Sequence, residues 1–340
     1  MSRRSPNGLV IDTATVACPF DPEASCRSLT IVVDEGDSTR TATYIAASTE
    51  PGSRLGTGDE AIVELFPEAD TLEILSAAPP DVAIAYQFSG DFQRRPLLWW
   101  TAALFAASVI AVGAWRGLAA LGGLVASLGV LLLFVLPAIL GGQSPLLVAI
   151  VGSSAIAFVA LYIAHGFRRM TNVAVIGMVS ALILTAVLSA VAVALAQFSG
   201  FASEESTLLT FFEGIDVRGL LLAGIVLGTA GALDDVTVTQ ASAVWQLRAA
   251  DPSQSAPALY RRAMSIGRDH IASTVNTLLL AYAGAALPLL VLFILSEQSL
   301  GAISNSEVVA VEIIRTLVGS IGLVAAVPIT TWLAARTAAH

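Results

Sequence analysis

The 340-residue sequence has no lysine and few charged residues of either sign. All 17 cations are arginine, which we attribute to a genomic composition bias. Charged residues make up 13% of the chain, about half of the roughly 25% that is usual in soluble domains. Hydrophobic residues make up 56%, and the mean hydropathy is +0.79, more than a soluble core can absorb. The composition therefore predicts a membrane protein whose main partner is the lipid bilayer.

Catalytic and cofactor-binding motifs are also missing. The sequence has no phosphate-binding glycine loop, nucleophile elbow or zinc motif. Its three histidines, His165, His270 and His340, are not spaced as metal ligands. We therefore expect no enzyme activity, no metal and no other cofactor, and ATP-driven transport by this chain alone is disfavoured. The net charge of −9 argues against a nucleic-acid partner, which would require a basic surface.

The charges divide the chain near residue 93. Residues 1–93 carry 15 acids and 5 arginines, whereas residues 94–340 carry 11 acids and 12 arginines. Short β-rich runs fill the first part and long apolar runs fill the second. The sequence therefore predicts two domains: a small all-β domain over residues 1–93, similar to an OB-like barrel, and a transmembrane helical bundle over residues 94–340.

The β domain is predicted to contain five short strands separated by turn residues. We expect these strands at residues 9–17, 29–34, 40–47, 61–66 and 82–88. Both cysteines of the chain, Cys18 and Cys26, lie in this domain at a spacing that a hairpin or a loop can bridge. An extracytoplasmic position favours a disulfide between them; free thiols are the alternative.

The second domain consists of apolar runs, and a helix of about 20 such residues crosses the hydrocarbon of a bilayer. About seven spans are expected, at residues 97–114, 117–140, 145–164, 172–196, 219–245, 271–295 and 308–335. Glycines 228 and 231 favour a break in the fifth span, of the kind found at transporter binding sites.

Arginine counts in the short loops predict the orientation. With the β domain outside, the inner side carries eight loop arginines and the outer side carries three beyond that domain. The sequence therefore predicts a cell-membrane protein with its N-terminal domain outside and its C-terminus in the cytoplasm. Residues 1–15 contain no apolar signal core, so we expect a further helix upstream to carry the domain across. The alternative is a cytosolic β domain and an inverted bundle.

Polar residues inside the apolar runs are the candidates for function, because a charge at mid-membrane costs several kcal/mol. In the fifth span Asp235, Thr239 and Ser242 share one helix face next to Asp234. Such a series of oxygens suits a cation, a proton or a polar substrate. Structural capping or pairing near the inner interface is the alternative for the aspartates.

A second cluster begins the sixth span. Arg268 and Asp269 are expected to form an interfacial pair, with an N-cap role for the span. Asn276 and Thr277 lie deeper, as site residues or as hydrogen-bonding contacts between helices. For His270 a structural role is favoured over proton transfer.

The seventh span contains Glu312 and Arg315, three residues apart on one helix. They are expected to pair, either structurally or as a coupling or gating pair. Gly319 and Gly322 follow on nearly the same face and allow another helix to approach closely.

These residues resemble those of the YibE/F-like family of bacterial membrane proteins. The resemblance covers residues 82–337, and the segments that carry it are 231–236, 266–270, 276–284, 312–324 and 327–330. Members are uncharacterised multi-pass proteins, usually with a helix before the β domain, so the resemblance implies fold and topology but no substrate. Two features depart from the family pattern. Asp234 and Asp235 stand where one acid is common, and Gln246 stands where an acid often follows the span.

Two functional hypotheses follow. The first is a transporter-like permease for an unknown small solute or ion, with Asp234, Asp235, Thr239 and Asn276 lining a site between the fifth and sixth spans. The second is a non-transporting scaffold or assembly partner that binds envelope components through its β domain. A homo-oligomer or a membrane-protein partner is compatible with both.

Overall fold

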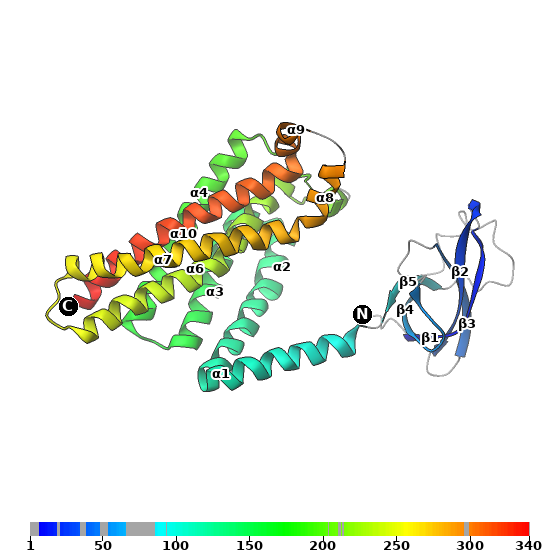
Figure 1. The fold of residues 1–340 in the computed structure, drawn as a ribbon, viewed down its shortest axis with the longest axis horizontal. Helices are drawn as coiled ribbons and strands as arrows, with labels where there is room; N and C mark the ends of the chain where they lie inside the picture. The colour runs from blue at the N-terminus through cyan, green and yellow to red at the C-terminus, as the bar shows by residue number, and fades with distance from the viewer. Residues whose placement is uncertain are drawn as a thin grey trace. The chain divides into compact units, whose positions relative to one another are not determined.

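The computed structural model describes residues 7–18, 21–34, 39–47, 54–65, 86–92, 94–202, 204–209, 212, 214–295 and 299–339. Contacts between Cα atoms divide the chain into two compact units, Met1–Ala107 and Ser108–His340. The domain boundary predicted near residue 93 lies inside the first of these units. Figure 1 shows the elements of both.

The first unit contains a five-stranded sheet with strand order β3-β2-β1-β4-β5. Its strands are β1 (Asn7–Cys18), β2 (Asp21–Asp34), β3 (Thr39–Ala47), β4 (Glu60–Leu65) and β5 (Tyr86–Phe92). Neighbours in this order pair antiparallel, and the two end strands, β3 and β5, also contact each other. Such a contact is what closure into a barrel requires, although the OB-like barrel itself stays a prediction. Residues 82–85, where the fifth strand was expected to begin, lie outside the described residues.

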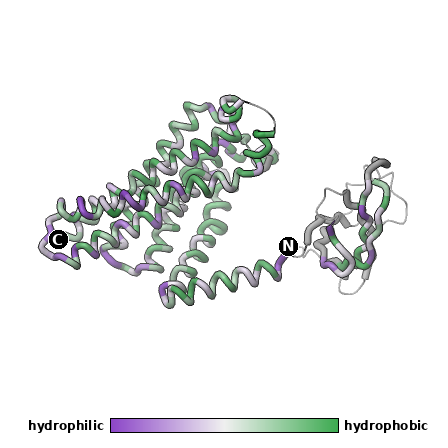
Figure 2. The backbone as a smooth tube through the Cα atoms, in the orientation of Figure 1, coloured by the Kyte–Doolittle hydropathy of each residue, from purple (hydrophilic) through white to green (hydrophobic). Residues whose placement is uncertain are grey.

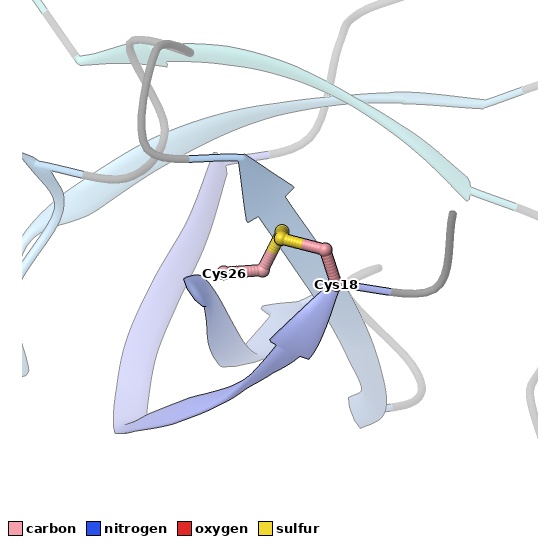
Figure 3. Close-up of a disulfide and its surroundings, with 2 residues drawn as sticks. All are labelled: Cys18 and Cys26. Atoms are coloured by element: carbon pink, nitrogen blue, oxygen red, sulfur yellow. A yellow bond between two sulfur atoms is a disulfide. The ribbon is translucent and has the colours of Figure 1, made fainter. Parts of the chain in front are cut away.

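A disulfide joins the first two strands of the sheet. Cys18, the last residue of β1, is bonded to Cys26 in β2, with their Cα atoms 4.9 Å apart (Figure 3). β1 and β2 are antiparallel neighbours, so the bond closes a short hairpin. Side chains near this hairpin form a small apolar core, and Val10, Leu29 and Ile31 are almost fully buried.

The long helices begin with α1 (Arg95–Val130), which continues through a π-helical turn, η2 (Leu131–Val135), into α2 (Leu136–Leu140). The 46 residues would extend about 69 Å at 1.5 Å per residue, more than twice the hydrocarbon thickness of about 30 Å. Non-helical backbone at Ala114 (φ 47°, ψ −127°) interrupts the helix. Just after this break Gly117 lies directly against the Val109 carbonyl, a contact that only a residue without Cβ allows. The break falls between the first two predicted spans.

The remaining helices complete the bundle. They are α3 (Pro145–His165), α4 (Arg169–Leu195), α5 (Glu204–Leu208), α6 (Val217–Ala250), α7 (Ala256–Ala285), α8 (Leu287–Leu295), α9 (Leu300–Asn305) and α10 (Glu307–Ala339). Among the described residues, five helices are long and apolar enough to cross a membrane, or six if α7 and α8 form one bent span. Figure 2 shows hydrophobic residues along most of their length. The fold is therefore a membrane helical bundle, and the count of seven spans stays a prediction.

Helix α6 lies at the centre of the bundle, packed against α3, α4, α7 and α10. Small residues permit close packing of these helices. Gly322 of α10 lies against Thr185 of α4, and Gly319 of α10 lies against Thr229 of α6. These contacts are the close approach that the two glycines were expected to allow.

The bounds of helices α6 and α7 contradict two predictions made from the sequence. Helix α6 runs unbroken from Val217 to Ala250, so the break expected at its glycines is wrong. The break lies instead in the next span, where α7 and α8 meet at an angle of 62°. Helix α7 begins at Ala256, after its N-cap residue Ser255. Because Arg268 and Asp269 therefore lie well inside a helix, the expected N-cap role is wrong for them.

Candidate functional site

One face of α6 carries a continuous row of small and polar residues, here called the α6 stripe. Successive members are three or four residues apart, so they lie on the same side of the helix. The members are Gly224, Gly228, Gly231, Asp235, Thr239, Ser242 and Gln246. The first part of the stripe thus lacks side chains, and the second part carries hydrogen-bonding groups.

Side chains from α7 and α10 lie over the glycine part of the stripe. A Cβ atom at Gly224 would lie 3.9 Å from Nη2 of Arg315, and one at Gly228 would lie 2.7 Å from the Tyr282 hydroxyl oxygen. Arg315 Nη1 donates to both carboxylate oxygens of Glu312, at 2.9 and 3.3 Å. The guanidinium carbon lies 5.8 Å from the Tyr282 ring centroid, within the range of a cation–π interaction. Glycine at position 228 therefore makes room for the Tyr282 hydroxyl beside the helix backbone, whereas the Arg315 guanidinium lies at ordinary contact distance from position 224.

These groups line a polar pocket, here called the arginine pocket, with a volume of about 840 Å³. It lies where α6 and α10 begin, and its wall includes Tyr282, Glu312, Arg315, Leu221 and Pro288. Pro288 belongs to α8, just beyond the bend after α7. Broken helices line the binding sites of many transporters, because the interruption frees backbone polar groups. The break in this chain lies beside its charged pair.

The polar part of the stripe begins with a carboxylate that contacts two other side chains. Asp235 accepts a hydrogen bond from Thr239 Oγ1 at 3.4 Å, and its other oxygen lies 3.5 Å from Nε2 of His270 in α7. The Asp235 side chain is 66% exposed, although it lies in the middle of an apolar helix. The adjacent Asp234 is half-buried, and its Oδ1 has no hydrogen-bond partner. One carboxylate and one imidazole, those of Asp235 and His270, thus meet between α6 and α7.

The second pocket, here called the glutamine pocket, lies toward the other end of α6 and has a volume of about 600 Å³. Its polar wall consists of Thr239, Ser242 and Gln246 from the stripe and His165 from α3. Gln246 Nε2 donates to Ser242 Oγ at 3.0 Å. The pocket therefore presents hydrogen-bonding groups and no carboxylate.

The two predicted site residues of α7 are both exposed, and only Thr277, seven residues after His270, lies on the same side of the helix as that histidine. Asn276 is exposed and lies about 120° around α7 from His270. Thr277 is also exposed, and its hydroxyl donates to the Ser273 carbonyl of its own helix. Arg268 and Asp269 are exposed as well; neighbouring positions on a helix do not face each other.

Two candidate site residues were missed in the sequence analysis. Tyr282 lies over Gly228, a contact that becomes visible only when the antiparallel pairing of α6 and α7 is known. Gln246 was given no role because an acid is common there in the family. Gln240, 2% exposed, donates to the Ala263 carbonyl at 2.8 Å and fixes α6 against α7 below the site.

The turn between α6 and α7 lies outside the spans and carries a separate charge. Hydrogen bonds from the hydroxyl and the backbone N–H of Ser253 lower the pKa of the Asp251 carboxyl below its usual value. Among the residues that the structure describes, no group of three or more His, Cys, Asp or Glu side chains is arranged to hold a metal ion.

Comparison with known proteins gave one match. No curated protein and no solved structure matches the chain. The family model described as YibE/F-like protein matches residues 101–340. This range includes the whole second unit, Ser108–His340. The chain therefore belongs to the YibE/F-like family.

Proposed function

We propose that this protein is a permease that moves a small solute or ion along the α6 stripe. The observation that supports this most directly is the position of the two polar pockets at opposite ends of one helix face. Leu221 lines the arginine pocket and Leu247 lines the glutamine pocket. The 26 residues between them correspond to about 39 Å of helix, and the hydrocarbon is about 30 Å thick. The pockets therefore open toward the two faces of the bilayer.

In this proposal Asp235 and His270 form the central site. Asp235 is the most exposed charge along the stripe, and a charge facing lipid costs several kcal/mol. A water-filled path past Gly231 removes this cost, since a Cβ atom at Gly231 would meet no atom within 4 Å. Glu312 and Arg315 form the gate, because their charges neutralise each other until a solute competes for one of them.

The proposed orientation has the β domain outside and the C-terminus in the cytoplasm. The arginines of the loops favour this orientation, and the disulfide between Cys18 and Cys26 suits an oxidising compartment. The arginine pocket then opens outward and the glutamine pocket inward. The proposed reaction is transport without a chemical step.

The second candidate is a scaffold that binds envelope components or another membrane protein through its β domain, with homo-oligomers as one form. The absence of shared lining residues between the two polar pockets, as far as the described residues show, supports this alternative. The exposed carboxylate of Asp235 favours the permease, because a scaffold has no need of an exposed acid in the middle of an apolar helix.

The test is uptake across a panel of ions and small solutes by full-length protein in proteoliposomes. Asp235→Asn is expected to abolish or strongly reduce the uptake of whichever solute the wild type accumulates. The matched control is Asp251→Asn, which changes an acid of the α6–α7 turn outside the pathway. Unchanged uptake by Asp235→Asn contradicts the site, and a wild type that accumulates nothing from the panel supports the scaffold.

A further inference from the structure

An apolar slot of about 200 Å³ lies beside the arginine pocket, between α7, α8 and α10. Its outer wall is formed by Leu279, Ile313 and Leu317, which are 50%, 41% and 54% exposed. Exposed large apolar side chains on a membrane-spanning helix face the lipid. The slot is therefore bordered by the bilayer on one side.

The slot and the arginine pocket have a common wall. Tyr282, Ala286, Leu289 and Glu312 line both of them. A molecule with its apolar part in the slot thus has its other end beside the Glu312–Arg315 pair. The bend between α7 and α8 lies at this junction, where the backbone leaves the helix axis and opens the space between α8 and α10.

Arg315 keeps an unused donor at this place. Its Nη1 atom donates to Glu312, but its Nε atom is buried and has no hydrogen-bond partner. A buried polar group without a partner is unfavourable, and more so when it is charged. The Arg315 side chain as a whole is 25% exposed and lines the arginine pocket, so an acceptor oxygen in the pocket can reach the guanidinium, and an anionic one would form the stronger, charge-assisted bond.

We infer that the arginine pocket and the slot together bind an amphiphile with an anionic head and an alkyl chain, which enters sideways from the bilayer. The head accepts hydrogen bonds from Arg315, and the chain lies between α8 and α10. This inference deepens the proposed function and rests on it, because it makes such an amphiphile the substrate of the permease. Both free fatty acids and anionic phospholipids have this chemistry.

The test is photo-crosslinking with full-length protein in nanodiscs of zwitterionic lipid. The probes are a long-chain fatty acid and a phosphatidylglycerol, each with a diazirine in the chain, and a fatty alcohol serves as the neutral control. We expect saturable labelling of α7–α8 and α10 peptides by at least one anionic probe. The anionic probe that labels more strongly shows whether the bound amphiphile is a fatty acid or a phospholipid. Labelling by the alcohol is expected to be weaker by about tenfold, the effect of one charge-assisted hydrogen bond.

Two variants separate specific binding from contact with surrounding lipid. Ala283 lines the slot but not the arginine pocket, so Ala283→Phe is expected to fill the slot and remove the saturable labelling. Ala281 is exposed on the same helix and lines neither the slot nor the arginine pocket. Ala281→Phe is therefore the matched control, and it is expected to retain the saturable labelling. The paired variant Glu312→Gln with Arg315→Gln leaves no unpaired charge and is expected to abolish the preference for anionic probes.

The outcomes distinguish this inference from the proposed function. Labelling that is not saturable, or that is equal in wild type and Ala283→Phe, overturns the amphiphile site. If uptake of a water-soluble solute through wild type is then observed, the permease stands and only its substrate class is wrong. Saturable anionic labelling without any transport supports the site and contradicts the permease.

Discussion

Gly322→Ala tests the close packing of α4 and α10, on which the position of the Glu312–Arg315 pair depends. A Cβ atom at Gly322 would overlap Oγ1 of Thr185. That hydroxyl is fully buried and already donates to the Ala181 carbonyl at 2.9 Å, so it cannot rotate away without losing its bond. The two helices must therefore move apart, and overpacking of this kind costs about 1–3 kcal/mol.

The expected change in thermal stability follows from the size of the bundle. For domains of roughly 150–250 residues, 1 kcal/mol corresponds to a change in Tm of about 2–4 °C. Gly322→Ala is therefore expected to lower the Tm of the purified protein in detergent by about 2–12 °C. Gly284→Ala is the matched control, because its Cβ atom would meet nothing within 4 Å, and its Tm should be unchanged or slightly higher.

A double substitution isolates the contact. Thr185→Ala removes the overlapping hydroxyl and leaves a Cβ atom 3.4 Å from the new methyl group at residue 322, an ordinary contact distance. The pair Gly322→Ala with Thr185→Ala should therefore melt higher than the sum of the single effects predicts. The reasoning is refuted if Gly322→Ala has the same Tm as the wild type, or if the Tm change of the double variant equals the sum of the changes in the two single variants.

Two further predictions concern charges. Glu312→Gln alone leaves the guanidinium of Arg315, 25% exposed, without its anion and should destabilise the bundle by about 3 kcal/mol. The neutral double variant with Arg315→Gln should lose less in the same thermal melt, and equal losses would argue against a paired charge. The depressed pKa of Asp251 stabilises its turn fully above the unfolded value of about 3.9. This contribution is lost as pH falls through the lower folded value, so the protection of the amides of residues 251–254, which is the intrinsic exchange rate at each pH divided by the observed rate, should fall there. An unchanged exchange rate in Asp251→Asn at neutral pH would contradict this role.

Hydropathy predicted most of the fold, because span length and apolar character are local properties. The predicted strands and spans overlap the observed elements, although β2 begins at Asp21, eight residues before its predicted start, and the break at Ala114 lies at a predicted boundary. A break was predicted in the fifth span, but the bend lies in the sixth, between α7 and α8. Glycine content suggested a break in α6, but the helix continues there, and Gly228 makes room for Tyr282.

The candidate site was predicted only in part, because spacing along one helix is a local property of the sequence and contacts between helices are not. Intrahelical spacing placed Asp235, Thr239 and Ser242 on one face, and the structure shows them there. Contacts between helices depend on the rotation of each helix in the bundle, which a single sequence does not reveal. For that reason Asn276 was expected beside the aspartates, whereas it is exposed and lies about 120° around α7 from His270, and the contact of His270 with Asp235 was not predicted.

The accessibility of single cysteines along α6 tests the central claim most directly. Both native cysteines are bonded to each other, so an introduced cysteine is the only free thiol. The account predicts that Gly231→Cys and Thr239→Cys react rapidly with a membrane-impermeant thiosulfonate, because the thiolate forms only where water reaches it. Ile321→Cys, at a 52% exposed position of α10 outside the pockets, is the lipid-facing control and should react slowly. Reaction of Gly231→Cys as slow as that of Ile321→Cys would contradict a water-filled path along the α6 stripe.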